Sequence, residues 1–334
     1  YHRTMGATDS LLDMATYVAF FPQLVAGPIE RGSHLLPQFF KRRTTTWDDW
    51  REGAWLIAWG LYKKMVIADN VARIVNDTFG PYDALTLTSV PEDGLRCLVA
   101  VYAFAFQIYG DFSGYSDIAR GTARILGFDI MVNFNIPYAA TSPSNFWQRW
   151  HISLSSWLRD YLYIPLGGNR RGNVYCNLMV TMLLGGLWHG AAWTFVLWGA
   201  YQGALLIVYR VVGLRTEQKT YPRWTSFLLW LLMFHLVCVG WLLFRAQNMT
   251  TIVTFLQGIV LHPHGSAATW AALRSLVFYC WFLVGMEAFQ YFTHRESPIE
   301  RLPWFARLNV WIVVIMSLLA LAPHDRMEFI YFAF

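Results

Sequence analysis

The stretch Leu187-Trp188-His189-Gly190-Ala191-Ala192-Trp193 lies inside an apolar segment that runs from Val174 to Tyr209 without a single Lys, Arg, Asp or Glu. A membrane-crossing helix needs roughly 20 apolar residues, so this segment is long enough to be embedded in lipid. Burying a polar group costs several kcal/mol when the group has no partner. An ionisable residue in such a place usually serves a function, and His189 is therefore the first candidate site residue.

The composition of the chain is that of a polytopic membrane protein. Of its 334 residues, 56% are hydrophobic and 14% are charged, whereas soluble domains carry about 25% charged residues. The net charge of +5 is attributed to basic loops such as Lys41-Arg42-Arg43 and Arg170-Arg171, which the positive-inside rule places in the cytoplasm. No basic patch is interleaved with exposed aromatic residues, so no nucleic-acid partner is predicted.

Hydropathy predicts an all-α chain with about eight apolar elements in a single membrane domain, residues 1–334. The strong candidates for membrane spans are Leu95–Tyr109, Tyr175–Trp188, Ala191–Val212, Ser226–Phe244, Leu276–Phe292 and Leu308–Leu321. Two weaker candidates, Leu11–Ile29 and Trp55–Val75, carry charged residues and are expected to be tilted, re-entrant or interfacial. The chain begins with Tyr1 rather than Met, so we expect the N-terminal spans of a longer protein to be missing.

The four cysteines predict neither a metal site nor a disulfide framework. Cys97, Cys176, Cys238 and Cys280 are widely spaced, and no pair has the spacing of metal ligands. Each falls in an apolar stretch, so all four are expected to be buried thiols that act as small hydrophobic side chains. No bound cofactor is predicted.

Pairs of glycines recur at a spacing of four residues, which lets helix backbones approach closely in lipid. The pairs are Gly110/Gly114, Gly186/Gly190 and Gly199/Gly203. Tight helix packing accounts for such pairs by itself. The pair around His189 is also expected to leave room beside the imidazole for a ligand or another backbone.

A second histidine, His151, lies in a segment that resembles an amphipathic helix, Asn145–Leu166. Its apolar residues recur at steps of three and four, and are Trp147, Trp150, Leu154, Trp157, Leu158 and Tyr161. The charged residues of the segment exclude a membrane span, so the helix is expected to lie in the plane of the membrane. His151 falls at the edge of the apolar face, from which it can point into the protein.

Two carboxylates, Asp111 and Asp117, flank a Gly/Ser-rich stretch that we expect to form a turn at the end of a membrane helix. Six-residue spacing does not fix the mutual geometry of two carboxylates. A structural role is therefore favoured over acid–base chemistry. In that role the carboxylates accept backbone hydrogen bonds or pair with arginines such as Arg149 or Arg159.

Taken together, these motifs resemble the membrane-bound O-acyltransferase family, and within it the bacterial alginate-type branch, which is related to the branch that acts in D-alanylation of teichoic acid. The stretches that carry the resemblance are Phe20–Ile29, Asp111–Ala119, Asn133–Tyr138, Phe146–Asn169, Gly185–Trp198 and Glu328–Phe332. Two positions depart from the family pattern, because Asn145 often corresponds to an acidic residue and Gln148 to a basic one.

The resemblance implies a ring of membrane helices around a thin centre, with in-plane and re-entrant helices. It implies that His189, in a Trp-His-Gly motif, and His151 are the catalytic residues. Substrate contacts are expected from Trp188, Asn145, Ser155, Arg159 and Asp111. The implied donor is acetyl-CoA or an acyl carrier thioester, and the implied partners are the lipid bilayer, a periplasmic acetyltransferase and an exported polysaccharide. The expected location is the bacterial inner membrane.

Acyl transfer to an alcohol needs a base, and a neutral imidazole serves this role near physiological pH. We therefore expect His189 to be the general base, while His151 orients the acyl carbonyl or stabilises its developing charge. An acyl-histidine relay stays open.

Two further functions compete with acyl transfer. One is a proton-coupled transporter or channel, which requires more ionisable residues than the nearly bare spans offer, His235 being the exception. The other is a non-catalytic scaffold of a polysaccharide export complex.

Overall fold

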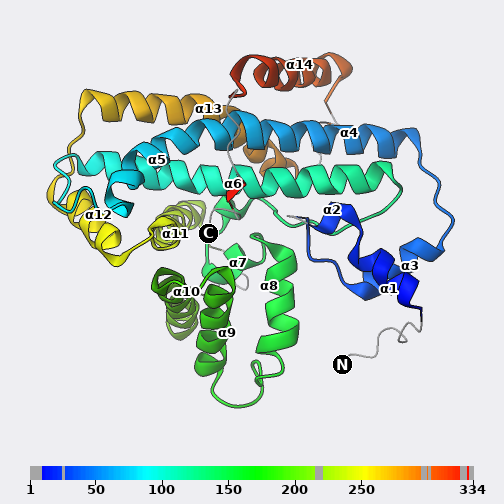
Figure 1. The fold of residues 1–334 in the computed structure, drawn as a ribbon, viewed down its shortest axis with the longest axis horizontal. Helices are drawn as coiled ribbons and strands as arrows, with labels where there is room; N and C mark the ends of the chain where they lie inside the picture. Colours follow the sequence, from blue (N-terminus) through cyan, green and yellow to red (C-terminus); the bar gives the residue numbers. More distant parts are fainter. Residues whose placement is uncertain are drawn as a thin grey trace.

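The computed structural model describes residues 10–24, 27–214, 221–294, 299, 302–323 and 329–330, and within these ranges every regular element is a helix (Figure 1). The helices are α1 (Leu11–Val18), α2 (Phe21–Leu24), α3 (Gly32–Phe40), α4 (Trp47–Leu61), η1 (Tyr62–Ala68), α5 (Asp69–Asp83), α6 (Gly94–Ile125), η2 (Pro137–Ala139), α7 (Pro143–Trp147), α8 (Ile152–Leu158), η3 (Arg159–Tyr163), α9 (Val174–His189), α10 (Trp193–Val211), α11 (Arg223–Arg245), α12 (Met249–Leu261), α13 (Ala267–Thr293) and α14 (Trp304–Leu321). The predicted all-α class is confirmed.

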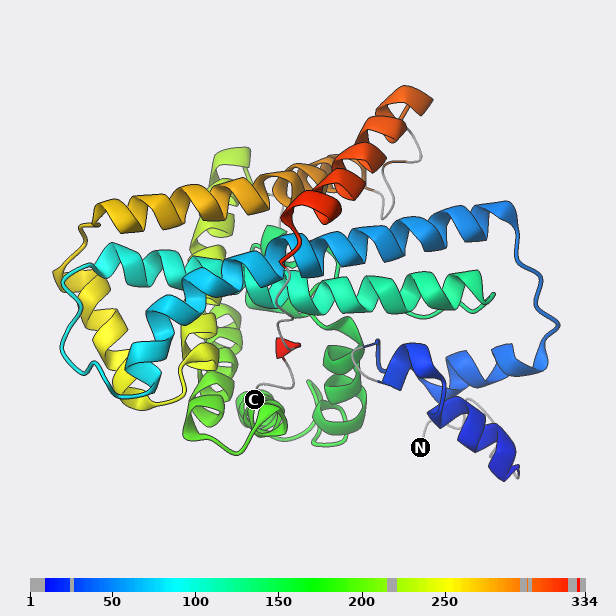
Figure 2. The same ribbon diagram turned by 45° about the horizontal axis from the view of Figure 1, so that its top comes forward.

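Helix α6 is the centre of the fold. It is in contact with α4, α5, η1, α11, α12 and α13. Figures 1 and 2 show the run from α4 through η1 into α5 lying beside α6, and α9 and α10 as a neighbouring pair of helices that runs in a different direction. Most of the buried side chains of α6 belong to one large hydrophobic core. The segment that follows α6, residues 126–136, leads from α6 toward α9 and α10, and the candidate site lies there.

Five helices in the described part of the chain are long and apolar enough to cross a membrane: α6, α10, α11, α13 and α14. The predicted spans from Leu95, Ala191, Ser226, Leu276 and Leu308 onward are therefore confirmed as long helices. The predicted span Tyr175–Trp188 corresponds to α9, which has 16 residues. At 1.5 Å per residue this helix is shorter than the roughly 30 Å of a hydrocarbon core.

In the described residues, neither of the two weaker candidates is a single α-helix over its whole length, and their tilted, re-entrant or interfacial placement stays a prediction. Helices α1 and α2 are short, and residues 25 and 26 of Leu11–Ile29 lie outside the described residues. The second candidate, Trp55–Val75, passes from α4 through the π-helix η1 into α5. Helix α12 was not among the predicted elements. Two of the basic residues near the end of α10, Arg215 and Lys219, also lie outside the described residues.

The helices α4 and α6 approach so closely that glycines are required at their contact. A Cβ atom on Gly60 would lie 2.4 Å from the Gly114 carbonyl oxygen, and one on Gly121 would lie 2.5 Å from that of Gly53. Between α9 and α10, a Cβ on Gly199 would lie 2.5 Å from the Met182 carbonyl oxygen. Close helix packing therefore explains the glycine pattern on both pairs of helices.

Substitution of Gly60 by alanine is expected to lower the thermal unfolding midpoint of the protein in detergent, because the new methyl group meets backbone rather than a movable side chain. Overpacking of this kind costs roughly 1–3 kcal/mol. Gly285→Ala in α13 is the matched control, since a Cβ there would have no neighbour within 4 Å. It should leave the midpoint unchanged or raise it slightly. Equal midpoints for both variants would contradict the close approach.

Ion pairs between η1 and α6 are buried in this core. Lys63 Nζ lies 2.6 Å from Asp117 Oδ2, and Lys64 Nζ lies 2.6 Å from Asp111 Oδ1 and 2.8 Å from Asp69 Oδ1. A π-helix has more residues per turn than an α-helix, so adjacent side chains are separated by a smaller angle. Both lysines of η1 therefore reach carboxylates of the same helix.

The expected turn at Asp111 and Asp117 is wrong, because α6 continues unbroken through both residues. Arg149 and Arg159 are not the partners: Lys63 pairs with Asp117, Lys64 pairs with Asp111, and the arginine near Asp117 is Arg120, at 4.0 Å. Asp111 does accept a backbone hydrogen bond, from the Ile330 amide at 2.7 Å. The helices carry more ionisable residues than the predicted spans do, because α6 extends past Tyr109 to include Asp111 and Asp117, and α13 carries Glu287.

The cysteine prediction holds for three residues and fails for one. Cys97, Cys238 and Cys280 are buried and free, whereas Cys176 is exposed. Cys176 lies in the first turn of α9, where only the opposite side of the helix packs against the rest of the protein. An apolar neighbourhood in sequence therefore does not show which side of a helix end faces the core.

Candidate active site

His151 stands at a break between two short helices rather than inside one long helix. The predicted helix Asn145–Leu166 is divided into α7, α8 and the π-helix η3. His151 caps α8 with a left-handed backbone, φ 43° and ψ 55°. Such angles are uncommon for residues other than glycine, and they cluster at functional sites. The break turns the His151 side chain inward, where it is 3% exposed.

The segment after α6 fixes the position of His151 through backbone and side-chain hydrogen bonds. The Ile152 amide donates to the Asn133 carbonyl, and the Asn135 amide donates to the Arg149 carbonyl, each at 2.9 Å. The Asn133 side chain then reaches His151, with Oδ1 at 3.1 Å from Nδ1. Asn133 is thus the residue that orients the imidazole.

The bonds of Asn133 determine which nitrogen of His151 carries the proton. Ser153 donates to Asn133 Oδ1 from its hydroxyl at 2.9 Å and from its amide at 3.3 Å, while Asn133 Nδ2 donates to the Ser116 hydroxyl at 3.1 Å. Oδ1 is therefore the acceptor that faces the imidazole, and Nδ1 of His151 donates to it. In a neutral ring this leaves the lone pair on Nε2.

Burial keeps His151 neutral. Burial, and to a smaller extent the charge that the nearby His189 would carry, lower the pKa of the imidazole from 6.5 to about 3. Desolvation penalises the charged form of any base, and two imidazolium ions in one apolar site would repel each other. The two predicted catalytic histidines therefore belong to one site.

Aromatic rings surround His189 at the end of α9. The rings of Trp188, Trp198 and Phe244 lie edge-on to the imidazole, with centroids 5.1 Å, 5.2 Å and 5.2 Å away. They come from α9, α10 and α11, so three helices meet at this residue. An imidazole held among apolar rings is shielded from water, which favours its neutral form.

A continuous set of rings joins the two histidines, and we call it the aromatic cluster: Phe134, Trp150, Trp241 and Phe244. Its centroids are 5.0 Å apart between Phe134 and Trp150, 4.7 Å between Trp150 and Trp241, and 5.8 Å between Trp241 and Phe244. The Phe134 ring stacks on His151 at 6.4 Å, and Phe244 lies beside His189. The two histidines therefore lie at the two ends of one series of packed aromatic rings.

The space beside the glycines on either side of His189 is filled by other protein atoms. A Cβ on Gly186 would lie 2.3 Å from the Phe195 carbonyl oxygen, and one on Gly190 would lie 2.5 Å from the Phe195 ring. The glycines are expected to leave room for a ligand or for another backbone, and the structure shows α10 there. These glycines seat α10 against α9 and so fix the position of His189.

The other predicted contact residues are scattered. Trp188 is 56% exposed. The Asn145 side chain accepts from Arg149 Nε at 3.1 Å, and the Ser155 hydroxyl donates to the Trp150 carbonyl at 3.1 Å. The Arg159 side chain is 63% exposed and pairs with Asp160. Of these four, Trp188 lies beside His189, and the Ser155 amide donates to the His151 carbonyl at 2.9 Å. The predicted contacts of all four with substrate stay predictions.

Asp111 lies close to the site through the C-terminal segment. It holds the amide of Ile330, and the ring of the preceding residue, Phe329, contacts Phe112 with centroids 6.2 Å apart. Phe112 in turn meets His151 edge-on at 4.6 Å. The predicted C-terminal motif is described only at residues 329 and 330; its other residues lie outside the described part of the chain.

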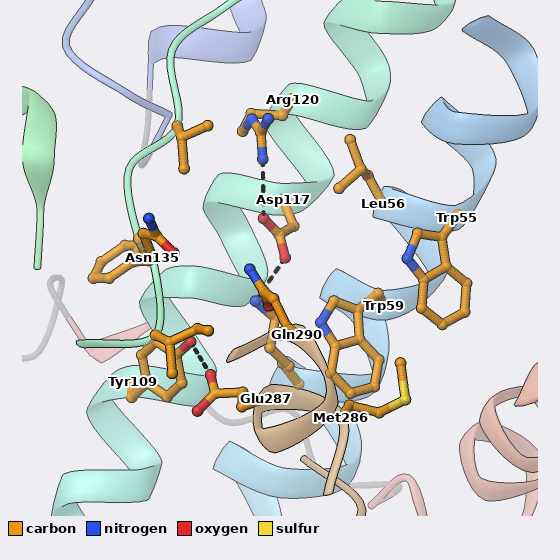
Figure 3. Close-up of a pocket in the computed structure, with 14 residues that line it drawn as sticks. Trp55, Leu56, Trp59, Tyr109, Asp117, Arg120, Asn135, Met286, Glu287 and Gln290 are labelled. Atoms are coloured by element: carbon orange, nitrogen blue, oxygen red, sulfur yellow. Dashed lines mark hydrogen bonds and ion pairs between the residues drawn. The ribbon is translucent and has the colours of Figure 1, made fainter. Parts of the chain in front are cut away.

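A cavity opens beside this site (Figure 3). It is bounded by α4, α6, α13 and the segment after α6. Phe134 lines it, so one ring separates the cavity from His151. Within the described residues, no group of three His, Cys, Asp or Glu side chains is arranged to hold a metal ion.

Sequence reasoning did not identify Asn133 or Ser153 as functional residues. Asn133 lies between apolar neighbours in the segment Asn133–Tyr138, and a polar amide in such a position is a usable signal. Ser153 lies two residues after His151 in the His-Ile-Ser stretch, a spacing that places its hydroxyl 3.3 Å from Nδ1. No pattern in the chain indicates the contact between His151 and Asn133 before the fold is known.

Known proteins match most of the chain. The profile described as the MBOAT, membrane-bound O-acyltransferase family, matches residues 6–253. The chain is 47% identical over 251 residues to a probable alginate O-acetylase of Azotobacter vinelandii, a match that covers 75% of this chain and 48% of that protein. It is 42% identical to a peptidoglycan O-acetyltransferase of Helicobacter pylori, a match that covers 75% of this chain and 46% of that protein. It is 29% identical to a teichoic acid D-alanyltransferase of Bacillus subtilis, covering 73% and 65%. The chain thus spans about half the length of the first two relatives.

Proposed function

Because the chain belongs to the membrane-bound O-acyltransferase family, we propose that the protein passes an acetyl group from a thioester donor across a membrane to a hydroxyl of an exported polysaccharide. The observation that carries the proposal is that the fold brings His151 and His189 to the two ends of one aromatic cluster. Relatives named for O-acetylation of alginate and of peptidoglycan support the same reaction.

In this proposal His189 is the general base. The acceptor hydroxyl loses its proton to the imidazole as its oxygen attacks the thioester carbonyl, the carbon–sulfur bond breaks, and the proton passes to the leaving thiolate. The buried rings of Trp198 and Phe244 cover one side of His189, which limits the access of water to the thioester from that side.

The hydrogen bonds of His151 favour a role different from the predicted one. With its proton on Nδ1 and bonded to Asn133, the neutral ring offers a lone pair at Nε2 and no donor there. It can therefore accept a hydrogen bond from the acceptor hydroxyl and orient it, whereas stabilising an oxyanion would require a proton on Nε2. We give His151 the role of orienting the hydroxyl.

The donor, in this proposal, is acetyl-CoA or an acyl carrier thioester that reaches the site from the cytosol, and the membrane is the bacterial inner membrane. A periplasmic acetyltransferase is the proposed partner on the far side of the membrane, where the polysaccharide is. A base that can be reached from both faces moves the acyl group while the carrier stays in the cytosol.

Reconstitution tests the proposal. The full-length protein is placed in liposomes with radiolabelled acetyl-CoA on one side and an oligosaccharide acceptor, with the periplasmic partner, on the other. We expect label to appear on the acceptor only when the protein is present. Label that stays on coenzyme A, with the protein folded and correctly inserted, would refute the proposal.

The stability of the protein should fall on acidification, partly because of His151. The unfolded chain takes up a proton on this imidazole below about pH 6.5, whereas the folded protein does so only near pH 3. Between these values the unfolded state binds more protons, so the free energy of unfolding decreases as the pH decreases. The unfolding midpoint of His151→Gln should therefore drop less than that of the wild type between about pH 7 and about pH 5. Equal drops would contradict a buried neutral His151.

Proton transport is a second candidate because buried ionisable residues line α6, η1 and α13. Lys63 and Asp117 neutralise each other, as do Lys64 and Asp111, and this favours a structural role for these ion pairs. Proton flux into liposomes in the absence of any acyl donor would support transport instead. A protein that binds the export partner but never cleaves the thioester would support a scaffold.

A further inference from the structure

The cavity beside His151 has a lining that combines flat rings with polar side chains. Trp55 and Trp59 come from α4, Tyr109 from α6, and Phe134 from the segment after α6. The polar lining consists of Lys63, Asp117, Arg120, Asn135, Glu287 and Gln290. Figure 3 shows Trp59, Glu287 and Gln290 on one side of the space and Asn135 on the other. Asn135 is exposed, so the cavity opens toward the surface at this residue.

The charges of this lining balance. Among the described residues, two cations and two carboxyl groups face the cavity. Lys63 Nζ is held by Asp117 at 2.6 Å and by the Ser113 hydroxyl at 2.9 Å, and Arg120 lies 4.0 Å from the same Asp117 carboxylate. A site for the phosphates of coenzyme A or for a polyanionic chain needs an excess of positive charge. This cavity has none.

The polar groups are arranged to hold hydroxyls. The Tyr109 hydroxyl is bonded to Glu287, so both groups are oriented at the wall of the cavity. Carboxylates accept hydrogen bonds, the Arg120 guanidinium donates them, and the amides of Asn135 and Gln290 do both. A hydroxyl both donates and accepts. A sugar ring also has apolar C–H faces, which pack on aromatic rings such as Trp59.

We propose that this cavity binds an uncharged sugar ring of the acceptor glycan. The inference rests on the proposed function and adds the class of acceptor to it. Pockets for small ligands combine aromatic walls with a few convergent polar groups, as here. Phe134 forms the wall between the bound ring and His151, with its centroid 6.4 Å from the imidazole. A ring bound in the cavity therefore lies next to the residue that orients the acceptor hydroxyl.

Calorimetric titration of the full-length protein in detergent tests this inference, with two probes of equal length. One is cellohexaose, which is neutral, and the other is a hexamer of mannuronate, which is charged. We expect cellohexaose to bind and the uronate to bind at least about tenfold more weakly. Trp59→Ala should weaken cellohexaose binding by about tenfold or more, because the ring face is lost.

Three further variants keep the test decisive. Gln290→Leu removes an amide at nearly constant volume and should weaken binding even if Trp59→Ala fails to fold. Trp281→Ala is the matched control, since Trp281 lies on α13 like Glu287 but is 59% exposed and does not line the cavity. It should bind as the wild type does. His189→Ala should also bind cellohexaose normally while losing acyl transfer, which separates binding from chemistry.

Several outcomes would overturn the inference. They are equal binding by Gln290→Leu and the wild type, tighter binding of the uronate, or displacement of cellohexaose by coenzyme A. If the wild type binds cellohexaose through these residues but transfers no acetyl group, the proposed function fails and the binding site stands. If acetyl transfer proceeds and the cavity variants bind normally, the binding site fails alone.

Discussion

Replacing His189 with alanine should reduce acyl transfer by the full-length protein about 10²–10⁴-fold, which is the usual contribution of a positioned general base. The imidazole is held by the edges of Trp188, Trp198 and Phe244, and the cavity left by alanine is bounded by these rings, so no other side chain takes its place. The measurement is the initial rate of label transfer from radiolabelled acetyl-CoA in proteoliposomes.

A second histidine in an apolar helix provides the control. His235 in α11 donates or accepts through Nε2 with the Tyr102 hydroxyl at 2.9 Å, and its Nδ1 lies 2.7 Å from the Leu231 carbonyl oxygen. It is exposed on the protein surface, and neither Tyr102 nor Leu231 belongs to the aromatic cluster. His235→Ala should therefore keep the wild-type rate. Unchanged transfer by a folded His189→Ala protein would remove His189 from the mechanism.

The sequence predicts the helical class, the five long spans and the two histidines because these depend on local hydropathy and on rare residues in apolar runs. His189 interrupts a run of uncharged residues, and this can be recognised from the sequence without knowing the fold. The break at His151 leaves no such signal. Trp147, Trp150 and Leu154 keep a helical spacing through it, so periodicity predicts one continuous helix.

Contacts between distant segments explain what the sequence does not predict. The left-handed backbone of His151 depends on the distant Asn133, which is hydrogen-bonded to His151, Ile152 and Ser153. Likewise, a turn is expected at Asp111 and Asp117 because the sequence does not show that lysines of η1 pair with them. With Lys63 and Lys64 in place, the carboxylates are neutralised inside an unbroken helix, and the Gly/Ser-rich stretch serves close packing instead.

This argument about buried charge leads to the second large effect, which concerns Lys64. Its ammonium lies between the carboxylates of Asp69 and Asp111, and all three side chains are at most 14% exposed. Lys64→Met leaves two carboxylates facing each other without a cation. Removing one partner of a buried ion pair costs about 3–5 kcal/mol. We therefore expect a large drop in the thermal unfolding midpoint in detergent, whereas Lys41→Met, at an exposed position, should leave the midpoint unchanged.

A double substitution separates lost charge balance from lost packing. In Lys64→Met combined with Asp111→Asn, one carboxylate charge is removed together with the cation, and the asparagine oxygen still accepts from the Ile330 amide. If charge balance is the cause, the double variant should be more stable than Lys64→Met alone, with a coupling energy of roughly 0.5–3 kcal/mol. Additive losses would show that the three groups do not act as a unit. Because Asp111 also anchors Phe329 against Phe112, and Phe112 contacts His151, Lys64→Met should slow acyl transfer as well, and the double variant should recover part of that rate.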